Sequence, residues 1–269
     1  MPTIDYQKIA KEIRKKILKM MYEARTAHVS SCLSCVDILT VLYFKILKMD
    51  SKNPLAENRD RFILSKGHAV AALYAILSKS GFFPEEVLET YCRNGEKLPG
   101  HSTRDTVPGI EVSTGSLGHG LSMGVGLALA AKKDGKDYRT FVLISDGECE
   151  IGSTWEAALF SSHHKLDNLI AIVDHNKLQA FGRVEDILNL KPLNEKWKSF
   201  GWAVREIDGH DFSEIERVLS EIPYEKGKPN VVIAHTIKGK GVSFMEDKFE
   251  WHYLSLTKKQ YEQALKELS

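Results

Sequence analysis

The stretch TFVLISDGECEIGSTWEAALFSSHHKLDNLIAIVDHNKLQ, residues 140–179, contains two apolar runs separated by a helix-like segment. The runs TFVLIS (140–145) and NLIAIVD (168–174) are rich in β-branched and aliphatic residues, which is typical of strands buried on both faces of a sheet. The segment 153–164 between them has the pattern of a crossover helix. Because strands joined in this way run parallel, the stretch predicts a β-α-β unit.

Similar patterns recur along the chain and extend this unit into a larger sheet. The further predicted strands are 61–64, 202–208 and 230–236. The further predicted helices are 5–24, 35–48, 68–80, 85–94, 119–133, 192–200, 212–222 and 257–268, with Pro84 and Ser213 as helix-start signals. This alternation predicts an α/β fold with a doubly wound, mostly parallel sheet and helices on both faces, in a single domain over residues 1–269.

Composition excludes several classes of function. The chain has 269 residues, 43% of them hydrophobic and 27% charged, with a net charge of +1. There is no basic field for nucleic acid, and the charged residues 1–20 match neither a signal peptide nor a membrane span. We therefore expect no nucleic-acid or membrane partner and a cytoplasmic location. Cys32 and Cys35 form a C-x-x-C in an apolar helical run, which we interpret as buried helix cysteines rather than a redox or metal pair.

Polar residues follow the two strands of the opening stretch. Asp146-Gly147 follows the first strand and Asn176 follows the second, so both are expected side by side at the carboxyl edge of the sheet. Asp146, Asn176 and the backbone carbonyl of Leu178 suit a magnesium ion whose other positions are filled by phosphate oxygens and water. Gly147 lets backbone N–H groups approach the phosphates. The site predicts a diphosphate-bearing cofactor, although an ordinary turn and strand end remain the alternative interpretation of these residues.

A glycine-rich loop also favours the prediction of a diphosphate-bearing cofactor. VSTGSLGHGLSMGVGLALA (112–130) leads into an apolar helix and offers a second backbone cradle for phosphate. Gly118, Gly120 and Gly124 also raise a dinucleotide-binding turn as an alternative. That alternative is disfavoured because EVST is a weak strand and residue 138, about 20 positions on, is Tyr rather than an acid.

With these features placed, the sequence resembles the thiamine-diphosphate-binding half of the transketolase family along nearly its whole length. The blocks that carry the resemblance, in order, are AHVSSCLSCVDIL, DRFILSKGHAVAALYAIL, LPGHSTRDTVPGIEVSTGSLGHGLSMGVGLALA, SDGE…WEA, VDHNKLQ, GWAVREIDGHD and AHTIKGKGVSFMED…WH. The resemblance implies the thiamine-diphosphate-binding fold and two-carbon (ketol) transfer from a ketose phosphate to an aldose acceptor.

The resemblance also implies the roles of individual residues. It implies thiamine diphosphate as the cofactor, with magnesium, or calcium or manganese in its place, held by Asp146, Asn176 and Leu178. The implied cofactor contacts are His68, Gly115, Ser116, Leu117, His119, Gly147, Glu148, Asn176 and His252. The implied catalytic histidines are His28, His68, His101 and His252, since imidazoles near neutral pKa can move protons onto and off sugar hydroxyls. Each of these histidines could also have a purely structural role.

The sequence indicates the roles of several other residues less specifically. We interpret His163 and His164 as helix-surface residues and His235 as a candidate group behind the site. The family commonly has glutamate at the position of Ile151, in an acidic network that links paired active sites and that Glu156 matches. We expect Glu150 to point differently from residue 151, so it does not simply replace the missing carboxylate.

The resemblance implies a partner. In this family a second, pyrimidine-binding domain supplies a glutamate to the cofactor, and this chain stops at Ser269 with no stretch that resembles that domain or a carboxyl-terminal one. We expect a separate carboxyl-terminal partner chain and an α2β2 assembly acting on sugar phosphates. Two alternatives stay open: a thiamine-diphosphate synthase or lyase of the deoxyxylulose-phosphate type, and a non-catalytic cofactor-binding or regulatory chain.

Overall fold

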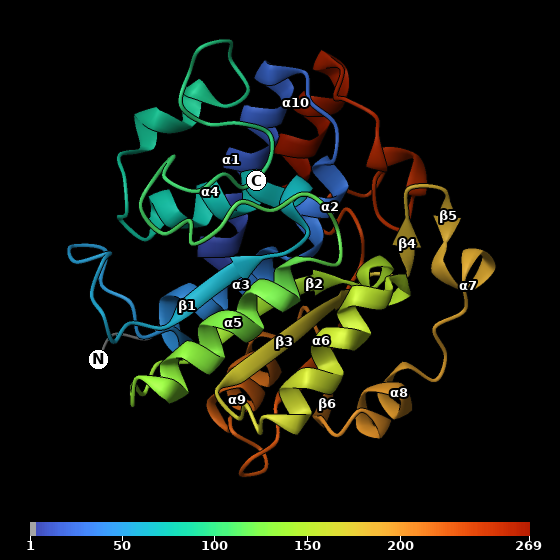
Figure 1. The fold of residues 1–269 in the computed structure, drawn as a ribbon. Coiled ribbons are helices and arrows are strands. Elements are labelled where there is room, and N and C mark those ends of the chain that lie inside the picture. The colour runs from blue at the N-terminus through green and yellow to red at the C-terminus, as the bar shows by residue number, and fades with distance from the viewer. Residues whose placement is uncertain (1–3) are drawn as a thin grey trace.

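The computed structural model describes residues 4–269 and has a five-stranded parallel sheet at its centre (Figure 1). Its strands, in the spatial order β1-β2-β3-β7-β6, are β1 (Arg61–Leu64), β2 (Thr140–Ser145), β3 (Leu169–His175), β7 (Asn230–His235) and β6 (Ala203–Asp208). All neighbouring strands of this sheet pair in parallel. The predicted strands and the parallel α/β class are therefore confirmed.

The unit β2-α6-β3 forms as the opening stretch predicts. Helix α6 (Gly152–His163) connects the two strands, and Ser145 at the end of β2 is paired with Asp174 of β3. The chain segments that follow both strands consequently leave the sheet at the same edge. Most residues of the two strands are fully buried, which explains why their sequences show no polar alternation.

Helices cover both faces of the sheet (Figure 1). The face with α5 and α6 is packed through one apolar cluster, which also includes residues of α8, and the opposite face through a second cluster that includes residues of α1, α3, α4 and α9. The α-helices are α1 (Tyr6–Ala24), α2 (Val29–Ser34), α3 (Val36–Val41), α4 (Val70–Lys79), α5 (Gly120–Lys133), α6 (Gly152–His163), α7 (Val184–Ile187), α8 (Leu193–Ser199), α9 (Phe212–Ser220) and α10 (Lys258–Glu267). Shorter 3₁₀ turns are found at Gly67–Ala69, Glu85–Thr90, Gly147–Glu150 and Phe249–His252.

Several local predictions were wrong. The helix expected over 35–48 is divided into α3 and a wider π-helical turn at Leu42–Ile46, and α2 precedes it without having been predicted. Because α2 and α3 are buried all round, their sequence has no amphipathic period that would mark where a helix ends. The segment 85–94 forms only a short 3₁₀ turn. Helix α9 is capped by Asp211, whose carboxylate accepts from two backbone N–H groups, rather than by Ser213.

Two further short strands form a hairpin beside the sheet. β4 (Leu178–Gln179) and β5 (Gly182–Arg183) pair antiparallel, directly after the segment that follows β3. This hairpin was not predicted, because strands this short give no periodic signal. It fixes the direction in which the chain leaves the carboxyl edge of the sheet.

The cysteines have the buried environment that was predicted. Cys32 and Cys35 are free and buried, and burial raises the pKa of the Cys32 thiol to about 12 and that of Cys35 to about 11. Thiols with such pKa values are poor nucleophiles and poor metal ligands at neutral pH. None of the helices over residues 4–269 combines the length and the apolar character needed to cross a membrane.

The packing of α5 on β2 leads to a test of stability. A Cβ atom at Gly124 would lie 2.4 Å from Val142 Cγ2, whereas one at Gly126 on the same helix would meet nothing within 4 Å. We expect Gly124→Ala to destabilise the fold by about 1–3 kcal/mol, because a β-branched core residue has little freedom to move aside. Gly126→Ala should instead stabilise it by about 0.5–1 kcal/mol through helix propensity. Urea unfolding of both variants measures the difference, and equal effects would contradict this account of the packing.

Candidate active site at the carboxyl edge of the sheet

The ends of β2 and β3 bring together the residues expected to hold a metal. Asp146 and Asn176 are buried, and Asp146 Oδ2 accepts a 2.6 Å hydrogen bond from the backbone N–H of Lys177. The other carboxylate oxygen accepts from Gly147 N–H at 2.9 Å, and Asn176 Oδ1 accepts from Leu178 N–H at 3.1 Å. The prediction that the two strand ends lie side by side is confirmed. The result is a compact group of oxygen atoms with a single carboxylate.

Three histidines from distant parts of the chain face one another near this edge. The ring centroids of His28 and His68 are 5.0 Å apart, those of His28 and His252 are 4.9 Å apart, and those of His68 and His252 are 5.5 Å apart. The backbone N–H of His28 also donates to the carbonyl of His252 at 3.0 Å. We call His28, His68 and His252 the histidine cluster. Its members lie at the start of α2, in the turn after β1, and in the turn near the end of the chain.

His101 and the glycine loop adjoin this cluster. His101 is exposed, and its charge is among the influences that lower the pKa of His28. A Cβ atom at Gly115 would lie 2.9 Å from His101 Cδ2, so only a glycine allows the loop to pass this close to the ring. His119 lies further along the loop, exposed, with Nδ1 3.2 Å from the carbonyl oxygens of Ser116 and Leu117.

The environment keeps the histidine cluster neutral. Burial lowers the pKa of His28 to about 4, with smaller contributions from the charges of His101 and Lys238. Burial and then the Lys238 charge lower the pKa of His252 to about 3. Burial, followed by the Lys66 charge, lowers the pKa of His68 well below its ordinary value. At neutral pH these imidazoles can each donate one hydrogen bond and accept another.

Two buried lysines, which sequence reasoning missed, lie at this edge. Lys66 forms an ion pair with Asp174 and donates to the carbonyl of Ser31 at 2.8 Å; although burial disfavours its charge, Asp174 raises its pKa. Lys238 Nζ donates to the Leu178 carbonyl at 3.0 Å and lies 2.9 Å from His252 Nδ1. Burial and the nearby Lys66 charge lower the pKa of Lys238 to about 8. Both lysines directly follow predicted strands, at 61–64 and 230–236, and that position is the signal that could have identified them.

Glu148 joins the glycine loop to the end of β2. Its side chain is fully buried. Its carboxylate accepts from the N–H of Gly118 at 3.0 Å and of Ser145 at 2.9 Å, and from the Ser65 hydroxyl. Burial raises its pKa. Glu148 therefore positions the loop, and its expected contact with the cofactor stays a prediction.

Ile151 and its neighbours point in different directions. A Cβ atom at Gly118 would lie 2.6 Å from Ile151 Cγ2, so the isoleucine packs against the glycine loop. Glu150 instead accepts two hydrogen bonds from Gln179 Nε2, at 2.8 and 3.0 Å. The expectation that residues 150 and 151 diverge is confirmed. Glu156 lies exposed on α6, away from both.

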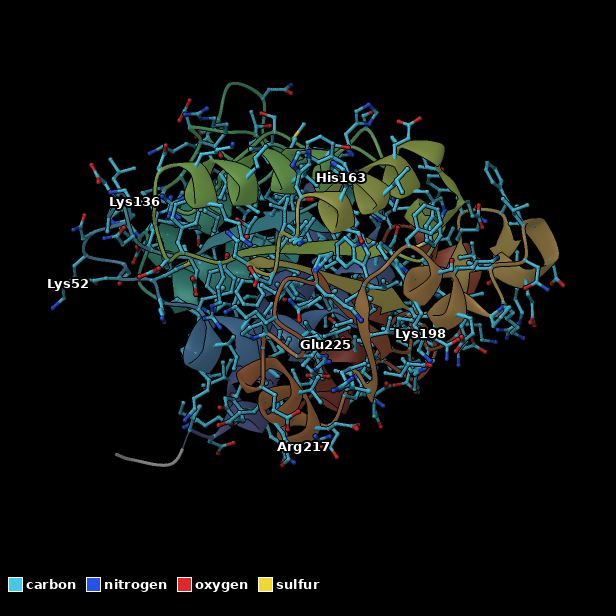
Figure 2. All side chains as sticks on the ribbon, turned by 60° about the horizontal axis from the view of Figure 1, so that its bottom comes forward. Lys52, Lys136, His163, Lys198, Arg217 and Glu225 are labelled. Atoms are coloured by element: carbon cyan, nitrogen blue, oxygen red, sulfur yellow. The ribbon has the colours of Figure 1, made fainter. Side chains whose placement is uncertain are left out.

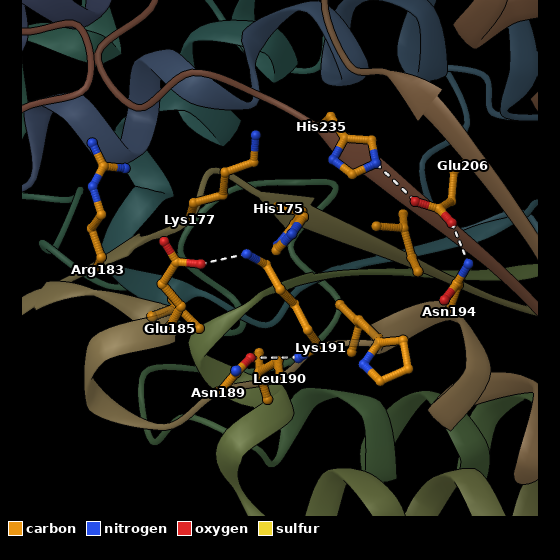
Figure 3. Close-up of a pocket in the computed structure, with 14 residues that line it drawn as sticks. His175, Lys177, Arg183, Glu185, Asn189, Leu190, Lys191, Asn194, Glu206 and His235 are labelled. Atoms are coloured by element: carbon orange, nitrogen blue, oxygen red, sulfur yellow. Dashed lines mark hydrogen bonds and ion pairs between the residues drawn. The ribbon is translucent and has the colours of Figure 1, made fainter.

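The remaining histidines lie outside the cluster. His163 is on the exposed surface of α6, as expected (Figure 2). His235 Nε2 lies 2.9 Å from a Glu206 carboxylate oxygen. Both residues line a cavity of about 400 Å³ (Figure 3). The ring of His175 lies between His235 and the Asp146 carboxylate, since its centroid is 5.3 Å from that of His235 and its Nδ1 is 3.4 Å from Asp146 Oδ2. His235 is thus two contacts away from Asp146.

Large apolar side chains are exposed around the site. Phe181, between β4 and β5, is 80% exposed, and Tyr253 and Leu254 are 60% and 48% exposed. The Tyr253 ring centroid lies 4.8 Å from that of His252, so this apolar rim adjoins the histidine cluster. Exposed apolar groups at the edge of a polar site are typical of a surface that another polypeptide covers.

Comparison with known proteins agrees with this geometry. The profile of the family described as "Transketolase, thiamine diphosphate binding domain" matches residues 5–269. An apulose-4-phosphate transketolase subunit of Phocaeicola vulgatus is 47% identical over 256 residues, covering 95% of this chain and 91% of that protein. A 6-deoxy-6-sulfo-D-fructose transketolase subunit of Clostridium sp. is 43% identical over 265 residues, covering 98% of this chain and 96% of that protein. The transketolase structure from Campylobacter jejuni matches with a TM-score of 0.93 at 32% identity, covering 100% of this chain and 43% of that one.

The charge of Lys238 leads to a test of the site's electrostatics. We expect Lys238→Met to raise the pKa of His252 from about 3, because it removes the nearest positive charge. Lys240→Met is the matched control, since Lys240 belongs to the same segment but its ammonium lies 3.8 Å from Glu246. Titration of the His252 ring by NMR measures both variants, and an equal shift in the two would contradict the assignment.

The same pKa shift predicts a pH dependence of folding. A histidine whose pKa is lower in the folded chain than in the unfolded chain costs stability as the pH falls below about 6.5, where the unfolded chain takes up the proton first. The loss stops once the folded histidine also takes up a proton, which in the unaltered chain happens at its pKa of about 3. Lys238→Met, with a higher pKa, should therefore lose less stability than the unaltered chain between pH 5 and pH 3, as measured by urea unfolding.

Proposed function

The chain belongs to the transketolase family, in which it corresponds to the thiamine-diphosphate-binding domain, and from this premise we propose that it is the amino-terminal subunit of a two-chain transketolase. The observation that carries the proposal is the neutral histidine cluster beside the Asp146–Asn176 strand ends. The proposed reaction is the transfer of a two-carbon ketol unit from a ketose phosphate to an aldose acceptor. The proposed unit of structure is one cofactor-binding domain over the whole chain.

The residues at the strand ends fit a diphosphate-bound metal better than a free one. Residues 4–269 contain no group of three or more His, Cys, Asp or Glu side chains that could hold a metal ion by themselves. Asp146, Asn176 and the Leu178 carbonyl offer hard oxygen atoms, which suit magnesium, calcium or manganese once phosphate oxygens complete the coordination. We propose that these residues hold the metal, and that Gly147 and the loop residues Gly115, Ser116 and Leu117 contact the cofactor.

Charge around this position favours the diphosphate. Lys238 is buried with its ammonium on the Leu178 carbonyl, so it places a positive charge beside the proposed metal ligands. The charge of Lys66, by contrast, is matched by Asp174. Charge-assisted hydrogen bonds from a buried ammonium are stronger than neutral ones. We therefore add Lys238 to the proposed diphosphate contacts.

The histidines contact the sugar hydroxyls. Thiamine diphosphate, when bound, supplies the nucleophilic carbon and the electron sink that two-carbon transfer requires. Because His28, His68 and His252 are neutral, each can donate one hydrogen bond to a sugar hydroxyl and accept another, whereas their lowered pKa values make them weak bases in the chain alone. His101, exposed at the edge of the glycine loop, is placed to contact the outer part of the sugar. His119 is the proposed contact for the pyrimidine or the substrate from the loop side.

The substrate is proposed by class only. The two relatives compared above carry the names of different ketoses, one with a 4-phosphate and one with a 6-sulfo group. What these sugars share is an anionic group on the carbon chain. We propose a ketose with such a group, a phosphate in the first instance, as the donor. The transketolase names of these relatives favour ketol transfer over a synthase or lyase, and the retained histidine cluster favours a catalytic role over a regulatory one.

The partner is proposed from the apolar rim. Phe181, Tyr253 and Leu254 are exposed, and the Tyr253 ring lies against that of His252. On α6, Leu159 and Phe160 are also exposed, 62% and 43%, on the same helix as Glu156. We propose that a carboxyl-terminal partner chain covers the rim and that two copies of each chain form an α2β2 assembly. The free cysteines are consistent with the proposed cytoplasmic location, where thiols stay reduced.

Removal of the proposed metal carboxylate tests the cofactor site. We expect Asp146→Ala to weaken binding of thiamine diphosphate with magnesium by more than about tenfold, since changes even to groups behind metal ligands cost that much. Calorimetric titration measures the affinity. Asp186→Ala, which changes an exposed aspartate on α7, is the control. Equal affinity of the Asp146→Ala variant and the unaltered chain would contradict the site.

An activity assay tests the proposed partner. We expect the chain alone to show little ketol transfer and the mixture with a pyrimidine-domain chain to restore it, because the proposed partner completes the cofactor site and excludes water from it. The assay measures transfer from a ketose phosphate to an aldose with each chain alone and with both. Strong transfer by this chain alone would overturn the two-chain proposal.

A further inference from the structure

The segment 236–241, which follows β7, carries Lys238 into the site. It contains Gly239 and Gly241, whose φ angles are +82° and +92°. A Cβ atom at Gly239 would lie 2.6 Å from the Met245 carbonyl oxygen, so the chain turns tightly here. A segment of this kind has no regular helix or strand to hold it, and its position depends on contacts with other elements.

A buried group of polar side chains holds two peptide units of the segment 236–241. The backbone N–H of Ile237 donates to His210 Nε2 at 2.9 Å, and Arg14 Nε donates to the carbonyl of Lys240 at 3.1 Å. Both side chains meet Asp37: Arg14 donates to its two carboxylate oxygens at 2.8 Å each, and His210 Nδ1 lies 2.7 Å from Oδ2. We call Arg14, Asp37 and His210 the Asp37 clamp.

The chemistry of the clamp allows only one arrangement of protons. A backbone N–H can only donate, so His210 Nε2 must accept, and its proton is on Nδ1, which donates to Asp37. Burial alone would raise the pKa of Asp37, but the hydrogen bond from His210 and the charge of Arg14 hold it below its ordinary value. Arg14 and Asp37 are 7% and 3% exposed, so the pair is shielded from water. The ionised Asp37 thus selects the tautomer of His210 that accepts from the loop.

Within residues 4–269, no hydrogen bond of the Asp37 clamp goes to the histidine cluster, Asp146 or Asn176. Its two anchors are the residues directly before and two after Lys238 in the chain, at Ile237 and Lys240. Between these anchors the Lys238 side chain extends to the Leu178 carbonyl and to His252. The same segment has two further attachments, from Gly239 N–H to the Ser30 carbonyl and from the Thr236 hydroxyl to Asp174.

We propose that the Asp37 clamp is a positioning device, in which His210 fixes the Ile237 peptide so that the Lys238 ammonium is held at the diphosphate position of the cofactor. This inference rests on the proposed function, since it assumes that a diphosphate binds beside Leu178. His210 and Asp37 act only through Lys238 and do not touch the cofactor. Loss of the clamp therefore weakens cofactor binding without unfolding the chain, because the Gly239 and Thr236 attachments remain.

Two substitutions of His210 separate its two hydrogen bonds. An asparagine amide reaches about as far as Nδ1 of a histidine, so His210→Asn keeps a donor for Asp37 but loses the acceptor for Ile237. A glutamine amide reaches about as far as Nε2, so His210→Gln keeps the acceptor for Ile237 but leaves Asp37 with one donor fewer. If His210 served only to satisfy Asp37, His210→Gln would be the more damaging change. The Asp37 clamp predicts instead that His210→Asn is the more damaging change.

Hydrogen exchange tests the attachment of the loop without any ligand. In the full chain, we expect the Ile237 amide to exchange about tenfold faster in His210→Asn than in His210→Gln, because a lost hydrogen bond to a buried partner lowers the local cost of opening. Urea unfolding of both variants checks that the fold is kept. Equal exchange of Ile237 in the two variants would overturn the clamp.

Calorimetry with magnesium diphosphate, and then with thiamine diphosphate and magnesium, tests the link to Lys238. Magnesium diphosphate is chosen because the proposed diphosphate contacts all belong to this chain. We expect His210→Asn to weaken binding of both ligands by about tenfold, an effect of the size expected for one charge-assisted hydrogen bond. In a Lys238→Met background the same change should have almost no further effect. Equal, additive losses in both backgrounds would show a general structural role and overturn the proposal.

Binding by the unaltered chain distinguishes failure of the positioning role from failure of the proposed function. If the unaltered chain binds neither ligand, either alone or mixed with a pyrimidine-domain chain, the cofactor site itself is wrong. If the unaltered chain binds and His210→Asn binds equally well, the cofactor site stands and the positioning role is refuted.

Discussion

The buried ion pair of Lys66 and Asp174 is the contact on which the rest of the site depends. It joins the end of β1 to β3, and Asp174 also accepts from the hydroxyls of Ser34 in α2 and Thr236 after β7. The two side chains are 1% and 0% exposed, so neither charge has water as an alternative partner. Removing one member of such a pair costs roughly 3–5 kcal/mol, because the other is left buried and uncompensated. The pair thus locks four chain segments in one arrangement beneath the histidine cluster.

The other charges near this pair are not matched in the same way. Lys66 and Asp174 cancel, Asp146 is the carboxylate among the proposed metal ligands, and Lys238 adds a positive charge on the other side of the Leu178 carbonyl. Burial and these lysines lower the pKa values of the surrounding histidines, so the imidazoles remain neutral beside an anionic cofactor site. A neutral imidazole can donate one hydrogen bond and accept another, which suits these rings to hold sugar hydroxyls.

Ile151 has a clear structural role despite its departure from the family's glutamate. It packs on Gly118 of the glycine loop, and Glu148 holds the same loop from beneath through its buried carboxylate. The loop is therefore fixed by an apolar contact and by a hydrogen bond to a buried carboxylate. Glu156 remains exposed on α6 beside Leu159 and Phe160, where a partner chain would meet it. Residue 151 therefore offers no carboxylate to the acidic network that the resemblance implies.

The sequence by itself determined the sheet and the meeting of its two polar strand ends. Parallel strands that are buried on both faces appear as continuous apolar runs, and residues directly after them must leave at one edge, which places Asp146 beside Asn176. The motifs also identified the histidines that the structure brings together. Short or fully buried elements such as α2 and the β4–β5 hairpin were missed, because their sequences contain no period to mark them.

Only the tertiary structure decided how the site is charged and held. The partners of Lys66, Lys238 and His210 are brought to them by folding from other parts of the chain, and no local pattern of residues specifies them. The pKa values of the histidines follow from burial, which depends on every element packed around them. The hydrogen bonds that Glu148 accepts from Gly118 and Ser145 were likewise not predicted, because sequence spacing cannot show which backbone groups a carboxylate meets. The sequence thus specified which groups meet, and the packing of the whole chain decided their ionisation and orientation.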